Sequence, residues 1–98
     1  MPLNHSNGSY FYEPQLGILH FQMHDGEQVV HCMVSDIALR NRAEISGLPQ
    51  EKVDELFEVY RSEVEALAAR QYDRGAQSPI VRVADLTPPP PLPARKKS

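Results

Sequence analysis

The chain contains no tryptophan, only one cysteine and no long apolar run. A single cysteine cannot close an internal disulfide, which fits a reducing compartment. A membrane-spanning helix needs about 18 or more consecutive apolar residues, and residues 1–9 lack the basic and apolar segments of a secretory leader. These absences predict a cytoplasmic protein with no membrane insertion.

Catalytic signatures are also absent from the sequence. It holds no phosphate-binding glycine loop, no serine nucleophile elbow, no H-E-x-x-H pair and no C-x-x-C pair. We therefore expect neither an enzymatic activity nor a bound cofactor.

Positive charge is concentrated at the end of the chain. The net charge is −3 over 98 residues, although Arg95, Lys96 and Lys97 lie within the last four positions. An acidic body is a poor match for nucleic acid, whose phosphates are bound by clustered lysine and arginine. The length allows one small soluble domain. Small domains bury a smaller share of their surface and are therefore less stable, and self-association commonly adds stability. We expect a homo-oligomer, specifically a dimer.

Two β-prone stretches, residues 16–24 and 27–34, flank the pair Asp25-Gly26 and predict a β-hairpin. An Asp-Gly pair favours a two-residue type I′ turn, because both central residues adopt positive φ there. The predicted register places His24 opposite Glu27, Phe21 opposite Val30, Leu19 opposite Cys32 and His20 opposite His31. Because side chains alternate along a strand, this register also sorts the histidines and the cysteine onto faces.

The start of the chain and the first helix are predicted from local composition. Residues 1–9 are polar and are expected to be a flexible N-terminus, whereas residues 10–12 are aromatic and predict a short strand or an apolar flap. A helix begins at Ser35-Asp36, because the serine hydroxyl can cap its first turn. Its apolar face includes Ile37 and Leu39, and Ser46-Gly47 ends it.

A longer helix is predicted from Pro49 to residues 73–75, because apolar residues recur along it at spacings of three and four. Residues 80–85 predict a last strand, which joins the hairpin after the helices have crossed over. The elements together predict one α+β domain over residues 10–86. It has two layers: a small antiparallel sheet, made of the hairpin and the final strand, and the helices on one face of that sheet.

Residues 87–98 form a proline-rich tail with a basic end, which predicts an extended, disordered segment outside the domain. Pro90, Pro93 and Arg95 match the pattern P-x-x-P-x-R of ligands for SH3-like grooves. So short a pattern is frequent by chance, and the composition favours a solubilising tail without such a partner.

The histidines and the cysteine offer two candidate chemistries. His31 and Cys32 are neighbours in one strand, so their side chains point to opposite faces and His31 cannot serve as base for the Cys32 thiol. Cys32 is therefore expected to pack as a small apolar residue. His20 and His31 share a face and are expected close enough to bind one metal ion through both imidazoles. His24 lies too far along that face to complete the site.

The face that carries His20 and His31 also carries Ile18, Val29 and Met33. A water-exposed sheet face is mainly polar, so this one is expected to be covered. The candidate covers are the aromatic N-terminal segment, a second subunit or another protein. These five residues are the predicted interaction surface.

Apolar positions spread along the chain carry a family resemblance. They are Leu19-x-Phe21, Val30-x-Cys32-x-Val34-Ser35, Ala38-Leu39, Phe57, Arg61, Val64-Glu65, Ala68, Gly75 and Val81-x-Val83-x-Asp85-Leu86. The set resembles the small bacterial proteins catalogued as domain of unknown function 1488 and covers residues 10–86. This resemblance implies a compact bacterial α+β domain and supplies no substrate, cofactor or catalytic residue. Core packing does not explain Arg61, which is a candidate for a structural ion pair or a contact site.

The sequence therefore favours a small non-enzymatic regulatory or protein-interaction module that forms a dimer. The alternative is a metal-binding or metal-sensing domain that uses His20 and His31.

Overall fold

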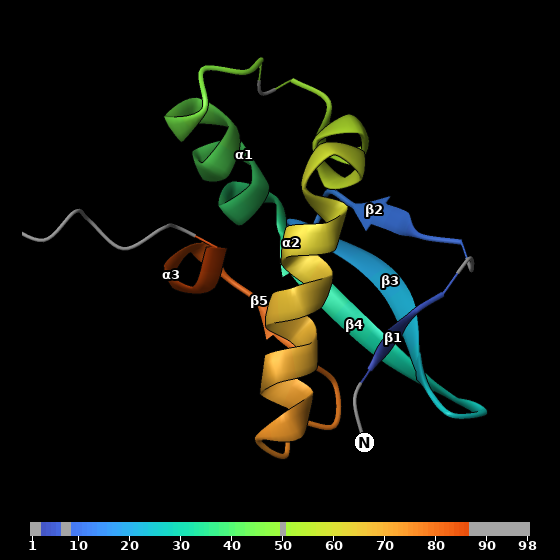
Figure 1. Cartoon of the computed structure of the whole chain (residues 1–98). Helices are drawn as coiled ribbons and strands as arrows, with labels where there is room; N and C mark the ends of the chain where they lie inside the picture. Colours follow the sequence, from blue (N-terminus) through green and yellow to red (C-terminus); the bar gives the residue numbers. More distant parts are fainter. Residues whose placement is uncertain (1–2, 7–8, 50, 87–98) are drawn as a thin grey trace, which may run out of the picture.

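A hairpin at the centre of a mixed sheet organises the fold (Figure 1). In this computed structural model, which describes residues 3–6, 9–49 and 51–86, strands β3 (Ile18–Asp25) and β4 (Gln28–Ser35) form the hairpin. Strands β1 (Asn4–His5) and β2 (Phe11–Glu13) pair antiparallel with β3, whereas β5 (Ile80–Val81) pairs parallel with β4. The predicted α+β class is confirmed, but the sheet is not wholly antiparallel. The connection from β4 to β5 crosses over through the helices, and such a crossover can place its two strands parallel.

The hairpin register differs from the predicted one by two positions. Asp25 lies opposite Gln28, so Gly26 and Glu27 form the turn. Within this turn only Gly26 has a positive φ, 62°, and that sign pattern fits a type II′ turn, which takes glycine first, rather than type I′. Phe21 therefore lies opposite Cys32, Leu19 opposite Val34, His20 opposite Met33 and Gln22 opposite His31. A slip of two residues keeps every side chain on its predicted face, because the side-chain period is two.

Helix α1 (Asp36–Ile45) begins and ends as predicted. The Ser35 hydroxyl accepts a hydrogen bond from the Ala38 N–H at 3.3 Å, and Gly47, with a φ of 74°, follows the C-terminal end. Its buried residues are Ala38, Leu39 and Ala43. Ile37, which was expected on the apolar face, is exposed, because only one side of this short helix packs on α2 and the sheet.

Helix α2 (Val53–Asp73) begins four residues later than predicted from Pro49. Lys52 precedes it in an extended conformation without a side-chain cap, so the start is fixed by tertiary packing of buried Val53 and Leu56. Pro49 belongs to the connection between the two helices, because the N–H of Leu48 donates to the Ala43 carbonyl at 2.8 Å and closes α1.

The predicted last strand, residues 80–85, divides into β5 and the one-turn helix α3 (Val83–Leu86). The Gln71 side chain accepts from the Ile80 N–H at 2.9 Å and donates to the Ile80 carbonyl at 2.8 Å. The Asp85 carboxylate accepts from the Arg82 N–H at 3.0 Å, which favours the start of a helix at this point. Gln71 thus satisfies the backbone groups of β5 that point away from β4, and the bond to Asp85 begins α3 directly after the strand.

The first residues take part in the fold, in contrast to the expected flexible N-terminus. Strand β1 pairs with Met23 and His24 of β3, and Leu3 is buried in the core. The predicted tail, residues 87–98, lies outside the described residues.

The helices lie together on one face of the sheet (Figure 1). Alternate residues of β3 and β4 face them and are buried, as are the apolar residues of the helices; this core includes Leu19, Phe21, Val30, Cys32, Val34, Leu39, Phe57, Val64, Ala68 and Val81. No described helix has the length and apolarity that crossing a membrane requires.

Candidate interaction surface

The sheet face that points away from the helices carries a mixture of apolar and polar side chains, three histidines among them. We call it the outer face and define it by Phe11, Glu13, Ile18, His20, Gln22, His24, Val29, His31 and Met33. Phe11 and Val29 are 60% and 58% exposed, whereas Ile18 and Met33 are half-buried. The residues of the predicted interaction surface thus share one face, and Phe11 extends it.

Glu13, His20 and His31 form a continuous hydrogen-bonded row on the outer face. Nδ1 of His20 lies 2.8 Å from Nε2 of His31, and Nε2 of His20 lies 2.8 Å from Oε1 of Glu13. The planes of the two imidazoles differ by 9°. The histidines are diagonal neighbours rather than the directly opposed pair that was predicted. The contact between Glu13 and His20 could not be predicted from the sequence around either residue, because it forms only when β2 pairs with β3.

This row has a defined proton requirement. Between the two histidines one ring nitrogen must carry a proton and the other must accept it, and the His20 nitrogen that faces Glu13 must donate to the carboxylate. With both histidines neutral, His20 donates from Nε2 to Glu13 and accepts at Nδ1 from Nε2 of His31. With His20 as an imidazolium, both of its N–H groups find acceptors. If both imidazoles are protonated, two donors face each other and the contact between them is lost.

The two imidazoles of the predicted metal site lie within hydrogen-bond distance of each other. Both ring nitrogens of His20 are already in hydrogen bonds, one with His31 and one with Glu13. Across residues 3–6, 9–49 and 51–86, no group of three or more histidine, cysteine, aspartate or glutamate side chains is arranged to hold a metal ion. His24 lies opposite Asn4 of β1, away from the row. Metal binding by His20 and His31 stays a prediction.

Strand β2 provides part of the cover that the outer face was expected to have. The Phe11 ring stacks on His20 with centroids 4.5 Å apart, while Tyr10 packs on the helix side against Phe57, at 4.8 Å. A hollow of about 170 Å³ lies beside Phe11, His20 and His31. The aromatic segment therefore shields His20 and leaves His31 exposed.

Cys32 is a buried core residue, as predicted. Burial raises the pKa of its thiol to about 12, and the negative charge of Glu65 acts in the same direction. A nucleophilic cysteine needs a lowered pKa and access to solvent. Cys32 has neither property, so the His31-Cys32 pair does not form a thiol site.

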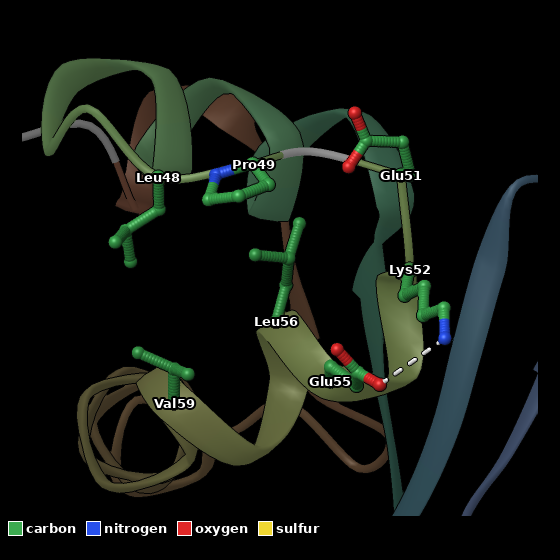
Figure 2. Close-up of a pocket in the computed structure, with 7 residues that line it drawn as sticks. All are labelled: Leu48, Pro49, Glu51, Lys52, Glu55, Leu56 and Val59. Atoms are coloured by element: carbon green, nitrogen blue, oxygen red, sulfur yellow. Dashed lines mark ion pairs between the residues drawn. The ribbon is translucent and has the colours of Figure 1, made fainter.

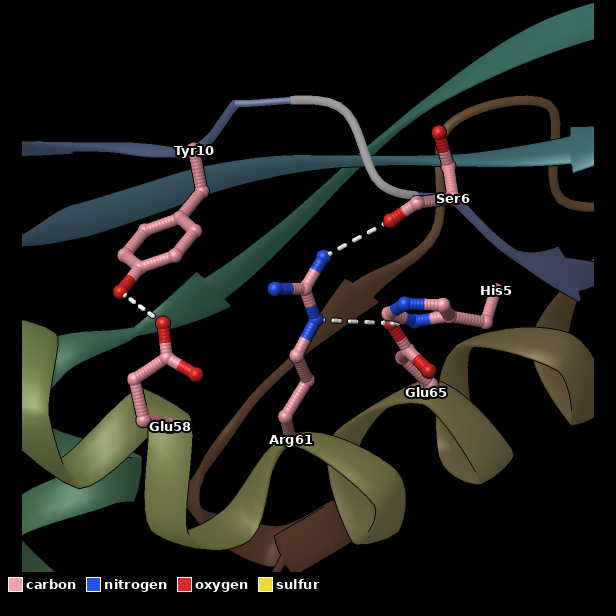
Figure 3. Close-up of polar contacts among 6 residues, drawn as sticks. All are labelled: His5, Ser6, Tyr10, Glu58, Arg61 and Glu65. Carbon is pink, nitrogen blue, oxygen red and sulfur yellow. Dashed lines mark hydrogen bonds and ion pairs between the residues drawn. The ribbon is translucent and has the colours of Figure 1, made fainter.

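Arg61 holds the start of the chain against α2 (Figure 3). Its Nε donates to Oε2 of Glu65 at 3.0 Å, and its guanidinium donates to the Ser6 carbonyl at 3.0 Å. Nδ1 of His5 lies 2.8 Å from the same Glu65 oxygen. The side chains of Arg61 and Glu65 are only 17% and 11% exposed. Arg61 thus makes a structural ion pair, and its partners explain why β1 can dock.

Three tyrosine hydroxyls donate hydrogen bonds to carboxylates of distant elements. No pattern in the sequence predicts these bonds. Tyr10 donates to Glu58 of α2, and this bond is the first cause that raises the Tyr10 pKa to about 12. Tyr12 donates to Asp36 at 2.6 Å. Tyr72 donates to Asp25 at 2.7 Å. These bonds join residues far apart in the chain.

A second apolar surface lies between the α1–α2 connection and the first turns of α2 (Figure 2). This groove, of about 270 Å³, is lined by Leu48, Pro49, Glu51, Lys52, Glu55, Leu56 and Val59. Nζ of Lys52 lies 3.6 Å from a carboxylate oxygen of Glu55 at its rim. The apolar pair Leu48-Pro49 in an otherwise polar connection is the sequence signal for it.

This architecture matches one protein family. The family model described as "Protein of unknown function (DUF1488)" matches residues 7–83. A crystal structure of a DUF1488 protein of unknown function from Shewanella loihica PV-4 is similar to this chain, with a TM-score of 0.64 and 17% sequence identity. The alignment covers 82% of this chain and 91% of that one, so the two share a fold. None of the curated proteins matches. The resemblance seen in the sequence is confirmed: the chain belongs to the DUF1488 family.

Proposed function

We propose that the chain is a non-enzymatic protein-interaction module that forms a homodimer, with the outer face as part of its contact surface. One observation carries this proposal: Val29 and Phe11 are both more than half exposed on a sheet face that no helix covers. Exposed apolar groups on an uncovered sheet face suit contact with another protein surface, and these two lie at separate places on it, Phe11 beside His20 and Val29 beside His24.

The surroundings of Phe11 suit a protein partner better than a small substrate. The hollow beside Phe11, His20 and His31 is about 170 Å³, which is below the usual range of roughly 300–1,000 Å³ for small-molecule sites. A larger groove of about 550 Å³ lies beside Val29, with Tyr72, Gln77 and Ser78 on its other side. The polar row of Glu13, His20 and His31 makes its hydrogen bonds internally. A surface with exposed apolar side chains beside a polar row that bonds internally suits contact with another protein surface.

The test is the mass of the full chain in solution, measured by light scattering over a range of concentrations. We expect a dimer, and we expect Val29→Lys to shift it towards monomer by placing a charge in the contact. Ile37→Lys is the matched control, because Ile37 is a similarly exposed aliphatic residue, at 63%, on α1. A monomeric mass of the unchanged protein at high concentration would contradict the proposal.

The second proposal is metal binding through His20 and His31, and the 2.8 Å approach of their ring nitrogens favours it. A metal would replace the proton between the two rings and would need further ligands. Elemental analysis of the native protein beside His20→Ala and His31→Ala tests it. Bound metal in the native protein alone supports this proposal, and its absence from the native protein ends it.

A further inference from the structure

The groove between the α1–α2 connection and the first turns of α2 exposes apolar side chains on the helical side of the molecule (Figure 2). We call it the helix groove. Leu48, Leu56 and Val59 surround the same hollow. Leu56 is buried, whereas Leu48 and Val59 are 38% and 58% exposed, and Ile45 at the end of α1 is exposed as well. Exposed apolar residues gathered at one hollow mark a binding surface.

The rim of the helix groove is acidic. Its charged lining residues are Glu51, Lys52 and Glu55, so two carboxylates accompany one ammonium group. Lys52 and Glu55 form an ion pair, but both side chains are largely exposed, and water weakens a pair of this kind. An occupant that combines apolar groups with positive charge therefore complements the groove.

The end of the sequence carries this combination. Residues 87–98 lie outside the described residues; within them, residues 88–93 are five prolines and Leu92, and residues 95–97 are all basic. A run of prolines has no N–H groups to donate and favours an extended conformation, so it binds by packing its rings and neighbouring side chains on an apolar surface. The basic residues follow directly and can reach an acidic rim.

The chain is long enough to bring this segment to the groove. The last described residue, Leu86, is buried in α3, and α3 packs against α1. The groove begins at Leu48, whose N–H bonds to the Ala43 carbonyl at the end of α1. The distance to be covered is therefore set mainly by α1, whose 10 residues span about 15 Å. An extended proline-rich chain advances about 3.1 Å per residue, which allows Leu92 to lie about 19 Å from Leu86.

We propose that residues 87–98 dock in the helix groove of their own chain, with Leu92 against Leu48 and Val59 and with the basic residues at the acidic rim. Tethering favours this occupant over a separate protein, because a linked segment has an effective concentration of about a millimolar. Docking covers the exposed apolar side chains of the groove, so any other protein that binds there must displace the tail. The contact goes beyond the proposed dimer, because none of these residues lies on the outer face.

A spin label at the end of the full chain tests this contact. Ser98→Cys provides one reactive thiol for a nitroxide, because Cys32 is buried and stays unlabelled. We expect the nitroxide to broaden the amide resonances of residues 55–59 more strongly than those of residues 83–86 and of the hairpin turn. Broadening that is strongest at residues 83–86 and falls steadily away from them would show an undocked tail and overturn the proposal.

A substitution in the groove, made in the same labelled chain, tests the apolar contact. Val59→Lys places a charge among apolar groups and repels the basic residues, so we expect it to reduce the broadening at residues 48 and 55 at least about twofold. Leu16→Lys is the matched control, because Leu16 is an apolar residue outside the groove that is 67% exposed. Undiminished broadening in Val59→Lys, or an equal reduction in both variants, would contradict docking in this groove.

A mixture of two samples identifies the copy whose tail is bound. One sample is isotope-labelled and carries no nitroxide, and the other carries the nitroxide without isotopes. We expect no broadening of residues 55–59 in this mixture, because each groove holds the tail of its own chain. Broadening as strong as in the singly labelled chain would assign the groove to a second copy and overturn the proposal. Light scattering on the same samples reports the outer-face dimer separately, so the two proposals can fail independently.

Discussion

At the scale of single residues, the ion pair between Arg61 and Glu65 shows how one polar side chain fixes a distant segment. Arg61 bonds both Glu65 and the Ser6 carbonyl, and the pair is largely buried. Removing Arg61 leaves the buried Glu65 carboxylate with only the His5 imidazole beside it, so we expect Arg61→Met to lower the free energy of unfolding by about 2–4 kcal/mol. Urea denaturation followed by circular dichroism measures this difference.

Two comparisons distinguish this effect from a general loss of charge. The pair Lys52 and Glu55 is 70% and 68% exposed, so Lys52→Met should cost less than about 0.5 kcal/mol. Arg61→Met combined with Glu65→Leu should recover part of the lost stability, because no unpaired charge remains. If Arg61→Met and Lys52→Met cost the same, Arg61 does not hold the structure in the way described.

The Cys32 thiol gives a second prediction at this scale. Its pKa is raised to about 12, chiefly by burial, so almost no thiolate is present at pH 8. We expect iodoacetamide to modify the folded protein far more slowly than the protein in urea, since the thiolate is the reactive form. Equal rates in the folded and unfolded states would show that Cys32 is accessible.

At the scale of elements, Gln71 fastens β5 to α2 in place of a further strand. Its amide bonds both the N–H and the carbonyl of Ile80. Gln71→Ala leaves these groups without partners, and we expect a loss of about 1–2 kcal/mol in the free energy of unfolding. Arg70→Ala, at an exposed position of the same helix, is the control and should change little. A Gln71→Ala protein as stable as this control would mean that β5 is held by packing alone.

The sequence predicts some elements more accurately than others. An element is predicted well where neighbouring residues determine its ends, and poorly where residues far along the chain determine them. Helix α1 is predicted to the residue because Ser35 and Gly47 act within one turn of its ends. The hairpin is predicted but its turn is misplaced, because either Asp25-Gly26 or Gly26-Glu27 satisfies a two-residue turn that contains glycine. The start of α2 and the break after Val81 depend on packing and on Gln71 and Asp85, which no local pattern reveals.

The same reasoning applies to the candidate site. Alternation along β3 and β4 places His20, His31 and Val29 on one face whichever of the two registers forms. The neighbours of His20 are set by β2, so neither Glu13 nor the stacking of Phe11 follows from the hairpin. His5 reaches Glu65 only because β1 docks beside β3.

At the scale of the whole molecule, one sheet face is packed and the other is open. The packed face contains Cys32 and most of the large core residues, and Tyr10 closes it from the side of β2. Two of these groups are held protonated by the fold: the thiol of Cys32 and the hydroxyl of Tyr10, each with a pKa raised to about 12. The packing of this face therefore depends on pH at the alkaline end.

The sign of this dependence follows from proton linkage. The ordinary pKa values of the two groups are 9.0 and 10.0, so in alkali the unfolded chain releases these protons before the folded one does. Stability from these groups is complete below pH 9 and falls as the pH rises from about 9 to about 12. Urea denaturation at a series of pH values should show this fall, and Tyr10→Phe should make it shallower, because phenylalanine has no proton to release. A stability that is constant from pH 8 to pH 11, or a fall of equal slope in Tyr10→Phe and the native protein, would show that Tyr10 is not held by Glu58 in the folded state.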